Sequence, residues 1–143
     1  MTRIKKGGAV IGEGGFGCVF KPALKCKNKN KRSVGVSKLL LTRDATQEYT
    51  LLKNIERKIS RINNNSKYFL LYELSMCKPD ELTYRDMENF NEKCKLFNKK
   101  KSASNNNSNT RKNINKDINK LRIINMPYGG IELTRILERI QYN

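Results

Sequence analysis

The stretch Gly12-Glu13-Gly14-Gly15-Phe16-Gly17-Cys18-Val19 matches the pattern G-x-G-x-x-G-x-V at every fixed position. Glycines at these positions let a backbone turn sharply and bring its amides close to a polyphosphate without interference from Cβ atoms. The same spacing marks dinucleotide-binding loops, in which the third glycine opens a helix. Here the loop follows the apolar run 9–11 and continues into the β-rich run 18–21, which Pro22 breaks. The sequence therefore predicts a phosphate-covering loop between two strands.

The segment after this loop predicts a third strand and a helix. Residues 34–40 are apolar and β-branched, and they follow an exposed basic turn at 24–33. A helix fits Thr46 to Ile62 because apolar residues recur there at three- and four-residue steps, with Asp44 or Thr46 as its cap.

The second half predicts two more strands and two more helices. Residues 68–74 and 121–126 are strand candidates, and residues 79–97 fit one short helix. Residues 131–142 carry apolar side chains on one face and predict a terminal amphipathic helix. The expected fold is α+β: an antiparallel sheet of about five strands, one packed helix and this terminal helix.

Charge is unevenly distributed along the 143 residues, whose formal net charge is +17. Residues 21–32 contain six basic residues and no acidic one, and residues 98–120 contain seven basic residues and eight asparagines. The second segment has too few apolar residues to offset its ordering entropy, so a disordered insertion is predicted at 98–120. Aromatic residues do not alternate with the basic ones in either run, so specific nucleic-acid recognition is not expected.

The cysteine and histidine content narrows the possible chemistry. Four cysteines (Cys18, Cys26, Cys77 and Cys94) form no C-x-x-C pair, so a zinc site is not expected. The chain has no histidine, which excludes Ser-His and Cys-His catalysis. The N-terminal residues lack the apolar core of a signal peptide and no run is long enough to span a membrane, so we expect an intracellular, cytoplasmic protein with four free thiols. Cys18 is expected to be a small filler within the loop.

The order of these features resembles the small lobe of eukaryotic-type serine/threonine protein kinases. A glycine loop, a third-strand lysine, a helix with an inward glutamate, two strands and a glycine-containing hinge follow one another as in that family. Ser37-Lys38, Glu48-Tyr49 and Met126-Pro127-Tyr128-Gly129-Gly130 look most like the divergent kinases of large DNA viruses. The resemblance covers 1–143 except the insertion, and it implies a viral protein in the host cell or virion.

The resemblance implies an ATP site. In that family the glycine loop covers the phosphates, and the third-strand lysine, here Lys38, contacts them while pairing with a glutamate of the helix. Glu48 is the expected partner and Glu56 remains the alternative. Ile11 and Val19 would form walls of the adenine pocket, and the backbone of residues 125–128 would bond the base. The residues so assigned are Ile11, Gly12, Glu13, Gly14, Gly15, Phe16, Gly17, Val19, Lys38, Glu48, Asn125, Met126 and Tyr128.

The chain departs from the family by lacking its catalytic motifs. It contains no H-R-D-x-x-x-x-N loop and no D-F-G motif, which supply the base and the magnesium ligands. We therefore expect an ATP-binding portion of a kinase that is inactive alone, and that uses Mg²⁺ only if a second lobe is supplied. Its expected partners are ATP and a protein that supplies the large lobe or serves as substrate. The alternative is a non-catalytic, pseudokinase-like interaction module.

Overall fold

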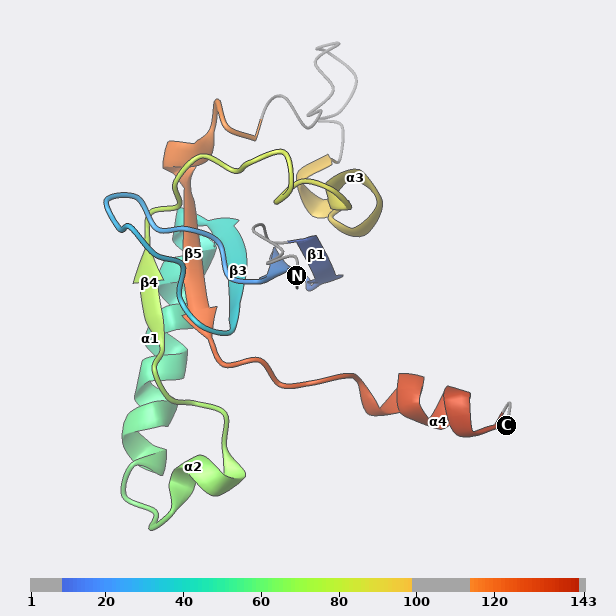
Figure 1. Cartoon of the computed structure of the whole chain (residues 1–143). Coiled ribbons are helices and arrows are strands. Elements are labelled where there is room, and N and C mark those ends of the chain that lie inside the picture. Colours follow the sequence, from blue (N-terminus) through green and yellow to red (C-terminus); the bar gives the residue numbers. More distant parts are fainter. Residues whose placement is uncertain (1–8, 99–113, 142–143) are drawn as a thin grey trace.

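The computed structural model describes residues 9–98 and 114–141, and its sheet has five antiparallel strands in the order β1-β2-β3-β5-β4 (Figure 1). The predicted α+β class and antiparallel sheet are therefore confirmed. The strands are β1 (Ala9–Glu13), β2 (Gly17–Lys21), β3 (Val36–Leu41), β4 (Ser75–Cys77) and β5 (Leu121–Met126).

The long helix α1 (Thr42–Ile59) begins directly after β3, without a loop, at Thr42 rather than at the predicted Thr46. Thr46 lies inside the helix, where its hydroxyl donates to the Thr42 carbonyl at 2.8 Å. Asp44 lies in the first turn, where a negative charge is favoured by the helix dipole. The remaining helical elements are short: α2 (Asn65–Tyr68), α3 (Phe90–Lys93), α4 (Leu133–Gln141) and the 3-10 turns η1 (Leu96–Asn98) and η2 (Ile118–Lys120).

The two faces of the sheet carry different cores, because successive side chains of a strand point to opposite faces. On one face, Leu40 and Ile124 pack with Ala45 of α1, and partly buried Tyr49, Leu52, Met76 and Met126 complete this small cluster. We call this the helix face.

The opposite face carries the larger core and is covered by a cap, which we define as residues 78–98 and 114–120. Strand residues such as Phe20, Leu39 and Ile123 pack there against cap residues such as Phe90 and Leu82. The Phe90 ring lies between those of Phe20 and Phe97, with both centroid distances at 6.4 Å. We call this the cap face; Figure 1 shows α3 of the cap beside β1.

An ion pair also fixes the cap to the basic turn 24–33. The guanidinium of Arg32 donates to both carboxylate oxygens of buried Asp86, at 3.0 and 3.4 Å, and to the Ala23 carbonyl at 3.0 Å. The backbone amide and the hydroxyl of Thr83 donate to the same carboxylate, each at 2.8 Å. The lysines of this turn at 27, 29 and 31 are exposed as expected, but two other residues of the turn, Leu24 and Cys26, are buried.

The predicted strand at 68–74 is wrong. Tyr68 ends α2, residues 69–74 pair with no strand, and most of this apolar run is exposed. Glu73 has a φ of 53°, which interrupts an extended conformation, and the fourth strand begins only at Ser75. The short helix predicted within 79–97 is present as α3, while the residues before it form turns.

The disorder predicted for 98–120 is wrong for residues 114–120. Ile114 is buried in the cap core, and the Asn115 side chain bonds both the amide and the carbonyl of Leu82, at 2.9 and 3.0 Å. Ile118 also packs against this core, so both apolar residues of 114–120 and the Asn115 amide join the cap, although the composition of the segment predicts disorder. Residues 99–113 lie outside the described residues.

Helix α4 stands away from the sheet at the end of the extended residues 127–132 (Figure 1). Its predicted apolar residues, Leu133, Ile136, Leu137 and Ile140, are all exposed. Within residues 9–98 and 114–141, no helix is long and apolar enough to cross a membrane.

Candidate functional site

The glycine loop joins β1 to β2 as a tight turn. The amide of Gly14 donates to the Gly17 carbonyl at 2.8 Å and closes it. Gly17 must lack a side chain, because a Cβ there would lie 2.4 Å from the Leu39 carbonyl oxygen of β3. The motif therefore secures a close approach of the loop to the strand that carries Lys38.

Lys38 and Glu48 form an ion pair across β3 and α1. Lys38 Nζ donates to both carboxylate oxygens of Glu48 at 2.7 Å, and both side chains are largely shielded from solvent. Glu56 instead pairs with Lys53, one helical turn away on the same helix. Of the two glutamates left open by the sequence, Glu48 is therefore the partner.

The Lys38 ammonium also lies beneath the glycine loop. A Cβ on Gly14 would be 3.9 Å from Lys38 Nζ, so a larger side chain at this position would project over the ammonium. Gly12, Val19 and Lys38 are in cross-strand register on the helix face. Helix α1 packs mainly on β3, β4 and β5, so among the described helices it leaves the β1 and β2 part of the helix face largely uncovered. Ile11 and Val19 are partly exposed there.

Three predicted site residues lie differently from their neighbours. The Phe16 side chain at the loop tip is 65% exposed, and its neighbour Gly15 likewise has no atom near its Cβ position. Glu13 turns its carboxylate to the cap, where it accepts from the Leu96 amide. Asn125 is buried between β3 and β4, with its side chain on the cap face and thus opposite to Lys38.

The end of the sheet where β5 leaves for residues 127–132 contains a cleft of about 520 Å³. Met126 and Tyr128 line it, together with Lys21 and Gly35. The ammonium of Lys21 lies 3.4 Å from the centroid of the Tyr128 ring, a cation–π contact that the sequence did not predict. Gly35 has a φ of 100°, and a Cβ there would lie 2.3 Å from the Met126 carbonyl oxygen, so glycine is required beside this segment.

The prediction of four free thiols is wrong. Cys18 of β2 is bonded to Cys94 of the cap, and Cys26 of the basic turn is bonded to Cys77 of β4. Cys18 is thus a covalent anchor rather than a filler. An even number of cysteines was the available signal, but four cysteines allow three pairings and a sequence alone does not choose among them.

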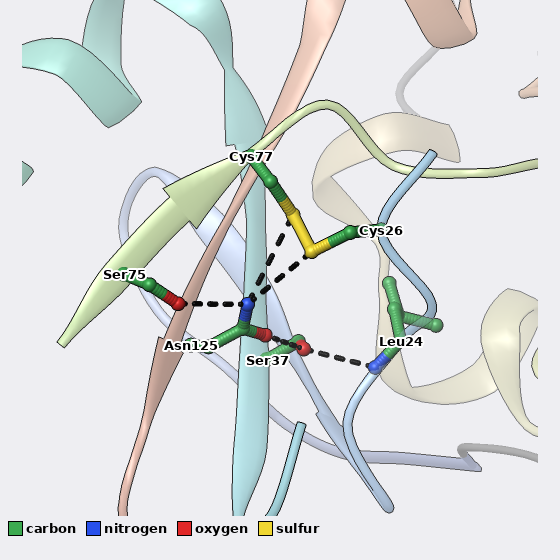
Figure 2. The surroundings of a disulfide bond; sticks show 6 residues. All are labelled: Leu24, Cys26, Ser37, Ser75, Cys77 and Asn125. Carbon is green, nitrogen blue, oxygen red and sulfur yellow. Dashed lines mark hydrogen bonds between the residues drawn. A yellow bond between two sulfur atoms is a disulfide. The ribbon is translucent and has the colours of Figure 1, made fainter. Parts of the chain in front are cut away.

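A buried polar network surrounds the Cys26–Cys77 disulfide (Figure 2). The Asn125 amide group faces both sulfur atoms, at 3.6 Å from Cys26 Sγ and 3.9 Å from Cys77 Sγ, and donates to Ser75 Oγ at 3.3 Å. Its carbonyl oxygen accepts from Ser37, whose own hydroxyl oxygen accepts from the Leu24 amide at 2.9 Å. This network joins three strands to the start of the basic turn, so the side chain of Asn125 is structural.

In the part of the chain that the structure describes, no group of three His, Cys, Asp or Glu side chains is placed to hold a metal ion. No family model, curated protein or solved structure matches the chain.

Proposed function

We propose that this chain is an ATP-binding lobe of the serine/threonine protein kinase type. The observation that carries the proposal is the Lys38–Glu48 pair at 2.7 Å beneath a closed glycine loop. An ammonium has three donor hydrogens, and Lys38 uses two of them on Glu48, which leaves one for a ligand. The Cβ position of Gly14 lies 3.9 Å from Lys38 Nζ, so the glycine leaves room for that ligand beside the ammonium.

The phosphate end of the site would use backbone amides and one ammonium. The Gly14 amide donates to the Gly17 carbonyl, and this hydrogen bond fixes the turn. The neighbouring loop amides would then contact phosphate oxygens. Lys38 would contact the α- and β-phosphates, while Glu48 keeps its ammonium in place. The Glu13 carboxylate, held by the Leu96 amide, does not add negative charge over this space.

The base end would lie on the open half of the helix face, between Val19 and the 125–128 segment. Ile11 and Val19 offer partly exposed apolar surface, and buried Val36 lies two residues before Lys38 on the same face of β3. The cleft at Met126 and Tyr128 borders this surface and suits a planar heterocycle. Phosphoryl transfer to a protein would require the metal-binding and catalytic groups of a second lobe, supplied by a partner.

Thermal denaturation with and without Mg-ATP tests this proposal, using the wild type, Lys38→Ala and Lys53→Ala. A ligand at about ten times its Kd stabilises the folded state by about 1.4 kcal/mol. For a chain of this size, that gain raises the midpoint by about 3–6 °C. We expect this rise in the wild type and in Lys53→Ala, and its loss in Lys38→Ala.

Lys53→Ala is the matched control, because Lys53 also pairs with a glutamate of α1 but lies away from the loop. A rise retained in Lys38→Ala would mean that nucleotide binds elsewhere on this basic chain. No rise in any of the three proteins would overturn the proposal.

The exposed apolar residues of α4 favour a second candidate, a non-catalytic protein-interaction module. Leu133, Leu137 and Ile140 are each more than half exposed, on a helix that stands off the sheet. Such surface commonly marks a protein-binding site. Light scattering distinguishes this candidate: self-association or a co-purifying protein that Leu137→Asp abolishes supports it, and a monomer unaffected by that change argues against it.

A further inference from the structure

One segment of the cap holds the glycine loop at both of its ends. At the entrance, Glu13 accepts a hydrogen bond from the Leu96 amide. At the exit, Cys18 is covalently bonded to Cys94, and the two sulfur-bearing side chains are completely buried. Cys94 and Leu96 are only two positions apart, so a single short piece of chain fixes both sides of the loop.

The covalent link is close to the loop backbone. Cys18 directly follows Gly17, whose carbonyl accepts the bond from Gly14 that closes the turn. Its other neighbour, Val19, is in register with Lys38 on the opposite face of the sheet. A shift of the Cys18 backbone would therefore move the loop closure and the wall of the open face together.

The cap segment that carries Cys94 has little regular structure of its own. Helix α3 has four residues, and Cys94 is its C-cap, with its amide bonded to the Phe90 carbonyl at 2.9 Å. Elements with short local ladders open more readily than central strands such as β3 and β5. Loss of the covalent bond would thus increase local opening first in α3 and in the glycine loop that it holds.

We propose that the Cys18–Cys94 disulfide is a redox-sensitive lock on the glycine loop. The bond is buried, so a dithiol reductant reaches it when the short helix α3 opens, and it then reduces the bond by two exchanges. One thiolate of the reductant attacks a sulfur of the bond and releases the other cysteine as a thiol; the second thiol of the reductant then attacks the mixed disulfide and releases the remaining cysteine thiol. Two electrons and two protons pass to the protein, which gains two thiols, and the reductant leaves as its own disulfide. With the lock open, the loop exchanges between conformations instead of keeping one.

The second disulfide provides the contrast that makes the proposal testable. Cys26–Cys77 lies beside Asn125. The basic turn and the cap are also joined there by two backbone hydrogen bonds of 2.8 Å, from the Lys27 amide to the Lys78 carbonyl and from the Asp80 amide to the Lys25 carbonyl. It has no contact with residues 12–17 among the bonds described. Its removal should loosen the basic turn and leave the glycine loop unchanged.

Hydrogen–deuterium exchange of the full chain measures this directly, in the wild type, in Cys26→Ser/Cys77→Ser and in Cys18→Ser/Cys94→Ser. Dithiothreitol added to Cys26→Ser/Cys77→Ser opens only the Cys18–Cys94 bond, and alkylation followed by mass spectrometry confirms the thiol count. We expect amides of residues 12–19 to exchange roughly tenfold faster after reduction, with β5 unchanged. Cys18→Ser/Cys94→Ser should show the fast loop without reductant and no further response to it.

Equal loop exchange before and after reduction of Cys26→Ser/Cys77→Ser would overturn the lock, and so would equal effects of the two disulfides on the loop. If Cys18→Ser/Cys94→Ser does not fold, the comparison of Cys26→Ser/Cys77→Ser before and after reduction still tests the lock. The lock itself does not rest on the proposed function, because the readout is the exchange of the loop amides. If the loop responds to reduction but the protein does not bind Mg-ATP, the proposed function is wrong and the lock still stands.

Discussion

The two faces of the sheet differ in how completely they are covered. The cap face is closed: it carries the larger core, two disulfides, a buried ion pair and the Asn125 network. The helix face is covered by α1 over β3, β4 and β5, while Val19 of β2 is partly exposed and residues 13–16 of the glycine loop are exposed. Stability is therefore concentrated on one side of the sheet, and the side with the candidate site is free to keep charged and apolar groups partly uncovered.

The largest effect that would sharpen this comparison comes from Asp86 on the cap face. Asp86→Asn keeps the shape of the side chain but leaves Arg32 without its counter-charge, and breaking a buried pair costs about 3 kcal/mol. Urea unfolding followed by circular dichroism should show this loss as a lower midpoint with an unchanged slope. A cost below about 1 kcal/mol, as for an exposed pair, would mean that the cap does not depend on this anchor.

The intermediate effect concerns the Lys38–Glu48 pair on the helix face. Lys38→Met with Glu48→Gln removes both charges and keeps most of the packing, so we expect a stability change of at most about 1 kcal/mol, of either sign. The same urea experiment measures it, and the single variants complete a double-mutant cycle. A loss as large as that of Asp86→Asn would break the comparison, because the pair would then be part of the framework rather than of an open site.

The helix face was largely predictable from sequence, because its features are local. The loop motif fixed the strand–loop–strand unit, and Lys38 stands at the end of a β-rich run. Glu48 could be favoured before the structure because it lies four residues before Leu52 and so on the inward side of the helix, while Glu56, in step with Leu52, stayed the alternative. The structure decides between them by pairing Glu56 with Lys53.

The cap face was not predictable because its contacts join distant residues. The two disulfides connect cysteines 76 and 51 positions apart, and no local pattern specifies such pairings. Within residues 79–97, the spacing of Met87, Phe90 and Cys94 predicted a short helix, but it did not show that the turns before α3 would bury Leu82 and Met87 against the sheet. The predicted strand at 68–74 failed for the converse reason, since an apolar run alone does not show that a partner strand is present.

The smallest effect concerns Asp80 at the rim of the cap, where the pKa sign can be worked out. The hydrogen bond from Lys25, followed by that from the Glu81 amide, lowers the pKa of the Asp80 carboxyl below its ordinary value of 3.8. A group whose pKa is lower in the folded state stabilises the protein above the unfolded pKa, and this contribution is lost as the pH falls through the folded pKa. Both partners are about two-fifths exposed, at 42% and 39%, so solvent screening keeps the contribution well below about 1 kcal/mol. Urea midpoints of the wild type and Asp80→Asn should therefore differ slightly and constantly at pH 5–7, and converge below pH 3.8. A difference as large as that of Asp86→Asn would show that the rim of the cap, and not only its buried anchors, holds the closed face together.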